Sequence, residues 1–338
     1  MRNSLLRLIS MACLTVAFFS SAQAQDPIFS QFFAAPLQLN PGFAGSAFAP
    51  RMGVIYRNQW SGFGGAYRTY GAYYEQSVER LNSGLGIYVE GDNAGQGILR
   101  TNTASVAYAY NLQFGRDYSL RLGLDAGIRQ VWLDWNKLVF PDQLDPIQGI
   151  QYISEETQPD DLNRTSLDLG AGLLFLSPHF WFGLGMKHLN RPNETLLSVN
   201  NIPGRGLPQR LTLHAGMDIP LGKNNKQAYP TFISPNFLFA QQGPFRQLNA
   251  GAYLGINRFF AGAWFRHAFH NADAAILHLG FREGIFKLGL SYDVNVSGLA
   301  AYSGGTYEMS LTVMLDQSEN LKRKRAKSQI NNCLGMFQ

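Results

Sequence analysis

The stretch LRLGLDAGI, residues 120–128, has apolar side chains at every second position, with Arg121 and Asp125 among the residues between them. Successive side chains of a β-strand point to opposite faces, so a period of two is typical of a strand with one apolar face. The same alternation recurs at residues 211–219 and 248–256. These segments indicate an all-β protein.

The alternation predicts fourteen strands along the chain. They lie at residues 51–60, 66–77, 83–90, 99–112, 118–131, 165–176, 179–189, 208–220, 230–241, 247–256, 259–266, 274–282, 285–294 and 305–315. Most are long enough to cross a bilayer at a tilt, and longer connections alternate with short ones. We therefore predict an antiparallel transmembrane β-barrel of about 14 strands, with long external loops and both termini in the periplasm. A soluble β-sandwich fits this pattern less well.

Aromatic residues near the predicted strand ends suit the two girdles at the membrane interfaces. They are Trp60, Tyr74, Trp132, Trp181 and Trp264.

The N-terminus has the features of a secretory signal peptide. Arg2 and Arg7 precede a mostly apolar run at residues 8–19, and Ala-Gln-Ala at residues 22–24 is a small-x-small cleavage site. The apolar run is too short to span a bilayer core of ~30 Å. Cleavage would leave Cys333 as the single cysteine, so no internal disulfide is expected.

The net charge of +5 lies at the two ends of the chain: residues 1–24 carry +2, residues 316–338 carry +3, and the remainder is neutral. This distribution gives no argument for nucleic-acid binding. We divide the chain into a signal peptide (residues 1–24), an N-terminal periplasmic or plug segment (25–50), a barrel (51–315) and a basic periplasmic tail (316–338). The segment 25–50 is too apolar for a free tail, so we expect it to pack into the lumen or the periplasmic mouth.

Charged residues on the polar strand faces are expected to point into the barrel, where buried charges persist when they are paired. A network of paired charges that fills the lumen is favoured, and a lumen that binds a charged segment of a partner is the alternative. The predicted network comprises Arg121, Asp125, Arg129, Asp168, Asp218, Lys287, Asp293 and Glu308, with His214, His278 and Arg282 on the same faces.

No constellation for catalysis is visible, and we predict neither an enzyme nor a cofactor. His267 and His270 lack further ligands for a metal, and Cys333 lacks a histidine partner. No phosphate-binding glycine loop and no nucleophile elbow is present.

The predicted external loop at residues 139–164 has a net charge of −5. It could be a solvated loop, a docking site for a basic surface of a partner, or a Ca²⁺ site. Its acidic residues are Asp142, Asp145, Glu155, Glu156, Asp160 and Asp161.

Several short motifs occur in an order that resembles the PorP/SprF family. They are Gln25-Asp26-Pro27, Phe29-Ser30-Gln31, residues 40–46 (NPGFAGS), residues 56–60 (YRNQW), residues 188–193 (HLNRPN), Ser291-Tyr292-Asp293 with Ser297, and Glu308-Met309-Ser310-Leu311. The resemblance covers nearly all of the mature chain. One departure is its end, because a tail with Cys333 and Phe337 follows the last predicted strand, whereas many outer-membrane barrels finish on an aromatic strand residue.

The resemblance implies an outer-membrane barrel of Bacteroidota that works with the type IX secretion system. Expected partners are secreted cargo with a C-terminal sorting domain, adhesins of gliding cells among them, periplasmic or outer-membrane subunits of the system, and outer-membrane lipid. His188, Asn190, Arg191, Pro192 and Asn193 are predicted partner contacts, because the family-like motif lies in a long external loop. The alternative is a pore or transporter for small solutes.

Overall fold

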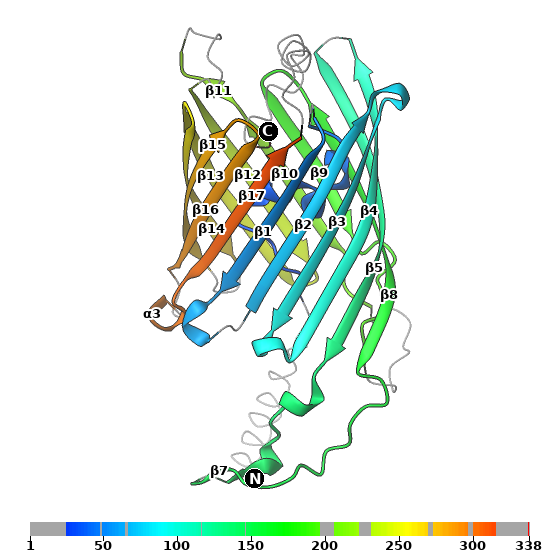
Figure 1. Ribbon diagram of the computed structural model, residues 1–338, viewed down its shortest axis with the longest axis vertical. Helices are drawn as coiled ribbons and strands as arrows, with labels where there is room; N and C mark the ends of the chain where they lie inside the picture. The colour runs from blue at the N-terminus through cyan, green and yellow to red at the C-terminus, as the bar shows by residue number, and fades with distance from the viewer. Residues whose placement is uncertain are drawn as a thin grey trace, which may run out of the picture.

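Fourteen antiparallel strands close into a single barrel in the computed structural model (Figure 1). The structure describes residues 25–47, 49–64, 67–115, 117–145, 147–196, 206–222, 231–269, 273–296, 300–315 and 337. Sequential strands pair with one another, and β1 pairs with β17. The strands are β1 (Arg51–Gln59), β2 (Tyr67–Val78), β3 (Ser83–Ala94), β4 (Leu99–Phe114), β5 (Tyr118–Leu133), β8 (Asn163–Leu176), β9 (Phe180–Lys187), β10 (Arg210–Met217), β12 (Phe232–Gln242), β13 (Phe245–Ile256), β14 (Phe259–Ala268), β15 (Ala274–Glu283), β16 (Phe286–Asn295) and β17 (Thr306–Met314).

The fourteen predicted strands are confirmed, and their ends differ from the prediction by at most four residues. A fifteenth strand of two residues, β11 (Ile219–Pro220), extends the wall beside β12. Each of the fourteen barrel strands is paired on both sides, which a barrel in lipid requires because its backbone groups have no water to bind.

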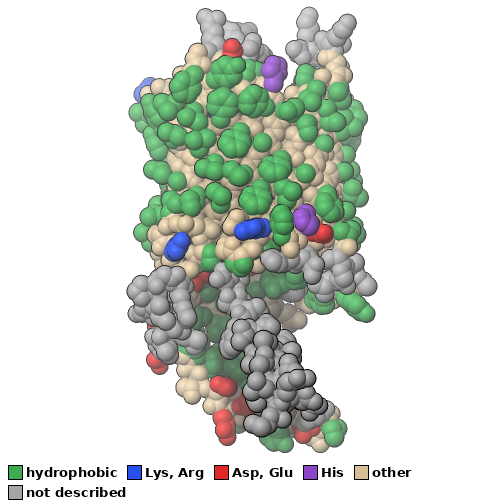
Figure 2. Space-filling view, turned by 180° about the vertical axis from the view of Figure 1, so that it is seen from behind, with side chains coloured by type: hydrophobic (Ala, Val, Ile, Leu, Met, Phe, Trp, Pro, Cys, Tyr) green, Lys and Arg blue, Asp and Glu red, His purple; other side chains and the backbone are tan. Residues whose placement is uncertain are grey.

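The outer wall is apolar, as the alternation predicted. In β5, Leu124 is 63% exposed, whereas its neighbour Asp125 is 6% exposed. Figure 2 shows apolar side chains over the whole barrel wall on the face it displays, with the charged side chains near the two rims. Such a belt fits the hydrocarbon region of a bilayer.

The prediction that aromatic residues form the interfacial girdles is wrong for two of the five residues. Trp181 in β9 and Trp264 in β14 are 1% and 5% exposed, and both lie in the apolar cluster inside the barrel. Strand alternation decides their direction: in β9, Phe180 and Phe182 face outward, so Trp181 must face inward. Tyr74 is exposed on the outer wall, and Trp60 and Trp132 are half-buried.

The two ends of the barrel differ in the length of their connections. Turns of two residues join β13 to β14 and β15 to β16 at one end, and Arg51 pairs with Met314 there, so both termini of the barrel lie at this end. We call it the periplasmic end, and the opposite one the external end, after the orientation predicted from the sequence. The longest connection in the described part of the chain joins β5 to β8 at the external end. It carries a small hairpin of β6 (Leu144–Asp145) and β7 (Gly149–Ile150), which extends far below the barrel in Figure 1.

In the described part of the chain, helical structure is confined to short pieces. They are η1 (Phe32–Ala34), α2 (Pro36–Leu39), η2 (Pro41–Phe43), η3 (Ser61–Phe63), η4 (Glu79–Leu81), η5 (Gly95–Gly97), η6 (Trp135–Lys137), η7 (Pro141–Gln143) and α3 (Ala300–Ser303). Within the described residues, no helix has the length and apolarity that a membrane span needs.

Candidate functional site: the N-terminal segment in the lumen

The N-terminal segment, residues 25–47, runs through the inside of the barrel. Every residue from 29 to 47 is buried, and its phenylalanines join the apolar cluster of the lumen. Asp26 contacts Arg129 near the external end of β5, whereas the chain enters β1 at Arg51 at the periplasmic end. The segment therefore extends from the external half of the lumen back to the periplasmic mouth.

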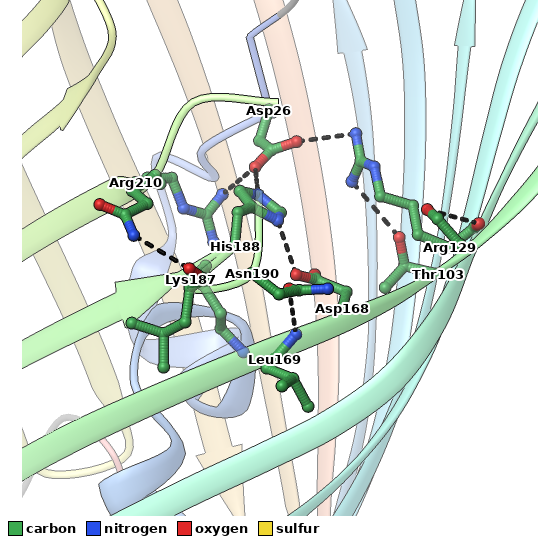
Figure 3. Close-up of polar contacts among 12 residues, drawn as sticks. Asp26, Thr103, Arg129, Asp168, Leu169, Lys187, His188, Asn190 and Arg210 are labelled. Atoms are coloured by element: carbon green, nitrogen blue, oxygen red, sulfur yellow. Dashed lines mark hydrogen bonds and ion pairs between the residues drawn. The ribbon is translucent and has the colours of Figure 1, made fainter. Parts of the chain in front are cut away.

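Asp26 is the centre of a buried charge cluster near the external end (Figure 3). Its carboxylate lies 2.9 Å from Arg129 Nη2 and 3.5 Å from Arg210 Nη1, and it also contacts Nε2 of His188. The Asp26 amide donates to Gln242 Oε1 at 2.9 Å. We call Asp26, Arg129, Asp168, His188, Glu194 and Arg210 the Asp26 cluster.

His188 stands between two carboxylates, because its Nδ1 lies 2.9 Å from Asp168 Oδ1 while its Nε2 faces Asp26. An ionised carboxylate only accepts hydrogen bonds, so this position favours an imidazolium that donates from both nitrogens. Burial opposes the charge, but Asp26 and Asp168 outweigh it and raise the pKa of His188 above its ordinary value of 6.5. Glu194 binds the other side of Arg129.

Burial would also raise the pKa of the Asp26 carboxyl. Arg129, His188 and Arg210 outweigh this effect and hold that pKa well below 3.8. Asp26 is therefore ionised at neutral pH, and the cluster ties the start of the segment to three strand ends.

A second set of contacts holds the segment at Ser30 and Gln31, four and five residues after Asp26. The amides of Ser30 and Gln31 both donate to the Glu308 carboxylate of β17 at 2.8 Å. Arg57 of β1 pairs with the same carboxylate and donates to the Ile28 carbonyl. A buried carboxylate thus accepts from two backbone amides and one guanidinium, which satisfies it without water.

Asn40 fixes the helical part of the segment. Its Nδ2 donates to the carbonyls of Leu173 and Leu184 at 2.9 and 3.2 Å, and its Oδ1 accepts from the Gly42 amide at 2.8 Å. Arg121 of β5 donates to the Gly42 carbonyl at 3.0 Å. The wall side chains therefore recognise backbone of the segment, not only its side chains.

Glycine in the wall makes room for this backbone. A Cβ on Gly123 of β5 would lie 2.3 Å from the Gly42 nitrogen, and a Cβ on Gly172 of β8 would lie 1.9 Å from Asn40 Oδ1. A side chain at either position would displace the segment.

The predicted lumen residues are mostly buried inside the barrel. Asp125 pairs with Lys187 at 2.6 Å and Asp293 with Arg266 at 2.8 Å. Asp218 lies apart from them: it is half-buried beyond the periplasmic end of β10, where its amide bonds to His179. The buried members are Arg121, Asp125, Arg129, Asp168, Lys287, Asp293 and Glu308, with His214 and His278, whereas Arg282 is half-buried near the end of β15.

The predicted lumen network did not include several charged residues that point into the barrel. The period of two in β1 would have identified two of them, because Arg51 and Arg57 alternate with the exposed Met52 and Tyr56. Asp26 has no such signal, because the segment around it is not periodic. The missed residues are Asp26, Arg51, Arg57, Glu75, Lys187, Arg210 and Arg266.

The motif at residues 188–193 forms a turn against the barrel wall. Asn190 donates to the Leu167 carbonyl at 2.6 Å and accepts from the Leu169 amide at 3.1 Å, so it extends the pairing of β8. His188 is buried toward the lumen and Pro192 is buried, whereas Arg191 is exposed and Asn193 is half-buried. A partner contact at these residues stays a prediction.

The acidic loop is exposed, and two of its carboxylates shape it. Asp142 accepts from the Glu155 amide at 2.7 Å, and Asp145 accepts from the amides of Ile147 and Gln148. These backbone hydrogen bonds lower the pKa of both carboxyls. The side chains of Glu155, Glu156, Asp160 and Asp161 are exposed around them.

Within the described residues, no group of three or more His, Cys, Asp or Glu side chains is placed to hold a metal ion. His267 Nδ1 lies 3.0 Å from Asp273 Oδ1. His270 and Cys333 lie outside the described residues.

The sequence model of one protein family, type IX secretion system membrane protein PorP/SprF, matches residues 21–313. None of the curated proteins matches the chain. Among solved structures, the chain is similar to Omp33 of Acinetobacter baumannii, with 9% identity, a TM-score of 0.41, and coverage of 79% of this chain and 98% of that one. It is also similar to the KdgM porin (8% identity, TM-score 0.35, 79% and 99%) and to BamA of Haemophilus ducreyi lacking POTRA domains 1–3 (10%, 0.39, 78% and 70%).

Proposed function

Because the chain belongs to the PorP/SprF family of type IX secretion system membrane proteins, we propose that its external loops bind the sorting domain of exported cargo. The protein is a component of that secretion system in the outer membrane. In this proposal the bound cargo is helped across the membrane or held at the cell surface, and adhesins of gliding cells are one class of such cargo.

The filled lumen is the observation that carries the proposal. A solute pore needs an open, water-lined path, but residues 29–47 are buried across the lumen and their backbone is bonded to the wall. The N-terminal segment thus acts as a plug, which argues against the alternative of a pore or transporter for small solutes. The surface that binds cargo is then expected outside the lumen, on the external loops.

The acidic loop is the external surface most suited to a protein partner. Its hairpin projects beyond the barrel, and Ile147 and Ile153 are each 93% exposed beside its carboxylates. Exposed apolar side chains within a charged rim are typical of a protein interface. A basic surface with apolar residues at its centre would complement this loop.

Co-purification from the native outer membrane tests the proposal. The protein would carry an affinity tag after Gly222, where an added Cβ meets no other atom within 4 Å, and bound chains would be identified by mass spectrometry. The test variant is Glu155→Gln/Glu156→Gln/Asp160→Asn/Asp161→Asn in the acidic loop. A control variant neutralises three carboxylates at the opposite end of the barrel, Glu79→Gln/Asp117→Asn/Glu283→Gln.

We expect a secreted protein with a sorting domain to co-purify with the wild type and the control. The loop variant should lose most of it at moderate ionic strength, because loss of complementary charge weakens encounter and binding. A barrel that purifies alone from secreting cells, and passes solutes in liposomes, would establish the pore alternative instead.

A further inference from the structure

A row of polar and aromatic side chains crosses the external end of β2 to β5, four strands that lie side by side in Figure 1. Arg68 of β2 is paired with Asn93 of β3, and Asn93 is paired with Arg100 of β4. Arg100 is in turn paired with Trp132 of β5. Residues paired across an antiparallel sheet project from the same face, so the four side chains form one row on one side of the wall.

Alternation places this row on the outer side of the barrel. In β2, Thr69 is 2% exposed, whereas its neighbours Arg68 and Tyr70 are exposed. In β4, Arg100 lies on the same face as Val106, which is 55% exposed. Each member of the row is the second residue from the external end of its strand. The row therefore lies at the edge of the apolar belt, which is the depth of lipid headgroups.

Arg100 is fixed from two sides. Its guanidinium carbon lies 4.7 Å from the centre of the Trp132 ring, and its Nε donates to the Gly97 carbonyl at 3.3 Å. A guanidinium stacked on an aromatic ring keeps the fork geometry that matches a phosphate. The cation is therefore ordered before a ligand binds, which reduces the conformational entropy that binding costs.

Lys137 of η6 brings a second cation to the same place. The Asp134 amide donates to the Ile98 carbonyl at 2.8 Å, which joins the turn after β5 to the turn before β4. A Cβ on Gly97 would lie 3.4 Å from Arg100 Nη2 and 3.6 Å from Lys137 Nζ. Asp134 Oδ2 lies 3.6 Å from Lys137 Nζ and offsets part of its charge. Two cations beside one turn repel each other, and an anion between them would stabilise both.

We propose that Arg68, Arg100 and Lys137 form a binding site for the phosphate of a lipid headgroup at the external end of the barrel. A guanidinium binds phosphate through two parallel hydrogen bonds, and an ammonium adds a point charge. Adjacent strands are about 4.8 Å apart, so Arg68 and Arg100 stand roughly 10 Å apart and can reach one headgroup together. The proposal does not depend on the proposed binding of cargo by the external loops.

The wall beside the row supplies the apolar half of a lipid site. Deeper along the same strands, Tyr70, Val89 and Val106 are 49%, 48% and 55% exposed on the outer side. Acyl chains that lie against these side chains add apolar contact, which a free phosphate ion cannot make. Trp132 lies between the two halves, at the depth where tryptophan is enriched in membrane proteins. The ligand is therefore a lipid phosphate and not the free ion.

Native mass spectrometry of the purified protein in detergent tests the site. Lipid A, an acylated disaccharide that carries phosphate groups, is the probe, and the same lipid without its phosphates is the comparison. The test variant is Arg68→Gln/Arg100→Gln/Lys137→Gln. The control variant removes the same charge from three exposed arginines elsewhere on the barrel, Arg80→Gln/Arg246→Gln/Arg258→Gln. Heat-modifiable migration in gels would show that each barrel is folded.

We expect lipid A to bind the wild type and the control variant with similar affinity. In the test variant its dissociation constant should rise by about 100-fold, because each cation near a lipid headgroup contributes roughly a factor of five. The lipid without phosphates should bind the wild type and the test variant equally weakly.

Three results would overturn the proposal. The first is equal affinity of lipid A for the wild type and the test variant, and the second is an equal loss of affinity in the control variant. The third is release of lipid A by inorganic phosphate at the same concentration as the lipid, because the site would then bind the free ion.

Discussion

Replacement of Asp26 by asparagine should release the start of the N-terminal segment from the wall. Asp26→Asn keeps the size of the side chain but removes the charge that faces Arg129, His188 and Arg210. Breaking a buried ion pair from one side costs about 3–5 kcal/mol, because it leaves an uncompensated charge. Glu194 still faces Arg129 and Asp168 still faces His188 in this variant. We therefore expect a loss of docking free energy at the lower end of this range, about 3 kcal/mol.

Hydrogen exchange at the backbone amides of Ser30 and Gln31 measures this release. Both amides are bonded to Glu308 in the docked segment, and they exchange when it undocks. A loss of about 3 kcal/mol should raise their exchange rates roughly 150-fold, because each 1.36 kcal/mol is a factor of ten. Asp142→Asn makes the same chemical change in the exposed loop and should leave these rates unaltered. Equal protection of Ser30 and Gln31 in Asp26→Asn and wild type would refute the reasoning.

Three further predictions concern the same segment. Asn40→Ala removes the donor that reaches the carbonyls of Leu173 and Leu184 and should lower the free energy of unfolding by about 1–3 kcal/mol, measured by urea titration in detergent; an unchanged midpoint would contradict it. Gly123→Ala should loosen the segment by about 1–3 kcal/mol in the exchange assay, whereas Gly222→Ala, which meets nothing within 4 Å, should not. Docking should also depend on pH: the contribution of His188, whose pKa is raised above 6.5, is complete below 6.5 and is lost as pH rises through the raised value. The contribution of Asp26, whose pKa is lowered, is complete above 3.8 and is lost as pH falls through the lowered value. Protection of the Ser30 amide, taken relative to its exchange in an unstructured peptide at the same pH, should therefore be greatest between these limits; protection that does not change with pH would argue against the cluster.

The barrel could be predicted from the sequence because its two determinants are local. Alternation in segments such as residues 120–128 specifies both a strand and its outward face, and most of the turns at the periplasmic end are short. The error at Trp181 and Trp264 arose because residue type was given priority over alternation. Both rings face inward to pack against Phe32 and Phe43 of the N-terminal segment.

The site could be predicted only in part. Alternation indicates that Asp125 and Glu308 point inward, but their partners are set by the segment and by neighbours across the barrel. Asp26 and Ser30 lie 103 and 278 residues from the groups that bind them, Arg129 and Glu308, and nothing in their local sequence is periodic. A long-range contact of this kind leaves no pattern in a single sequence.

Ion conductance of the purified wild-type protein in a planar bilayer tests the central claim most directly. If the N-terminal segment fills the lumen and the protein works through its external surface, the membrane should stay at background conductance. Brief openings should become frequent in Asp26→Asn. A steady, water-filled conductance of the wild-type barrel would contradict the account.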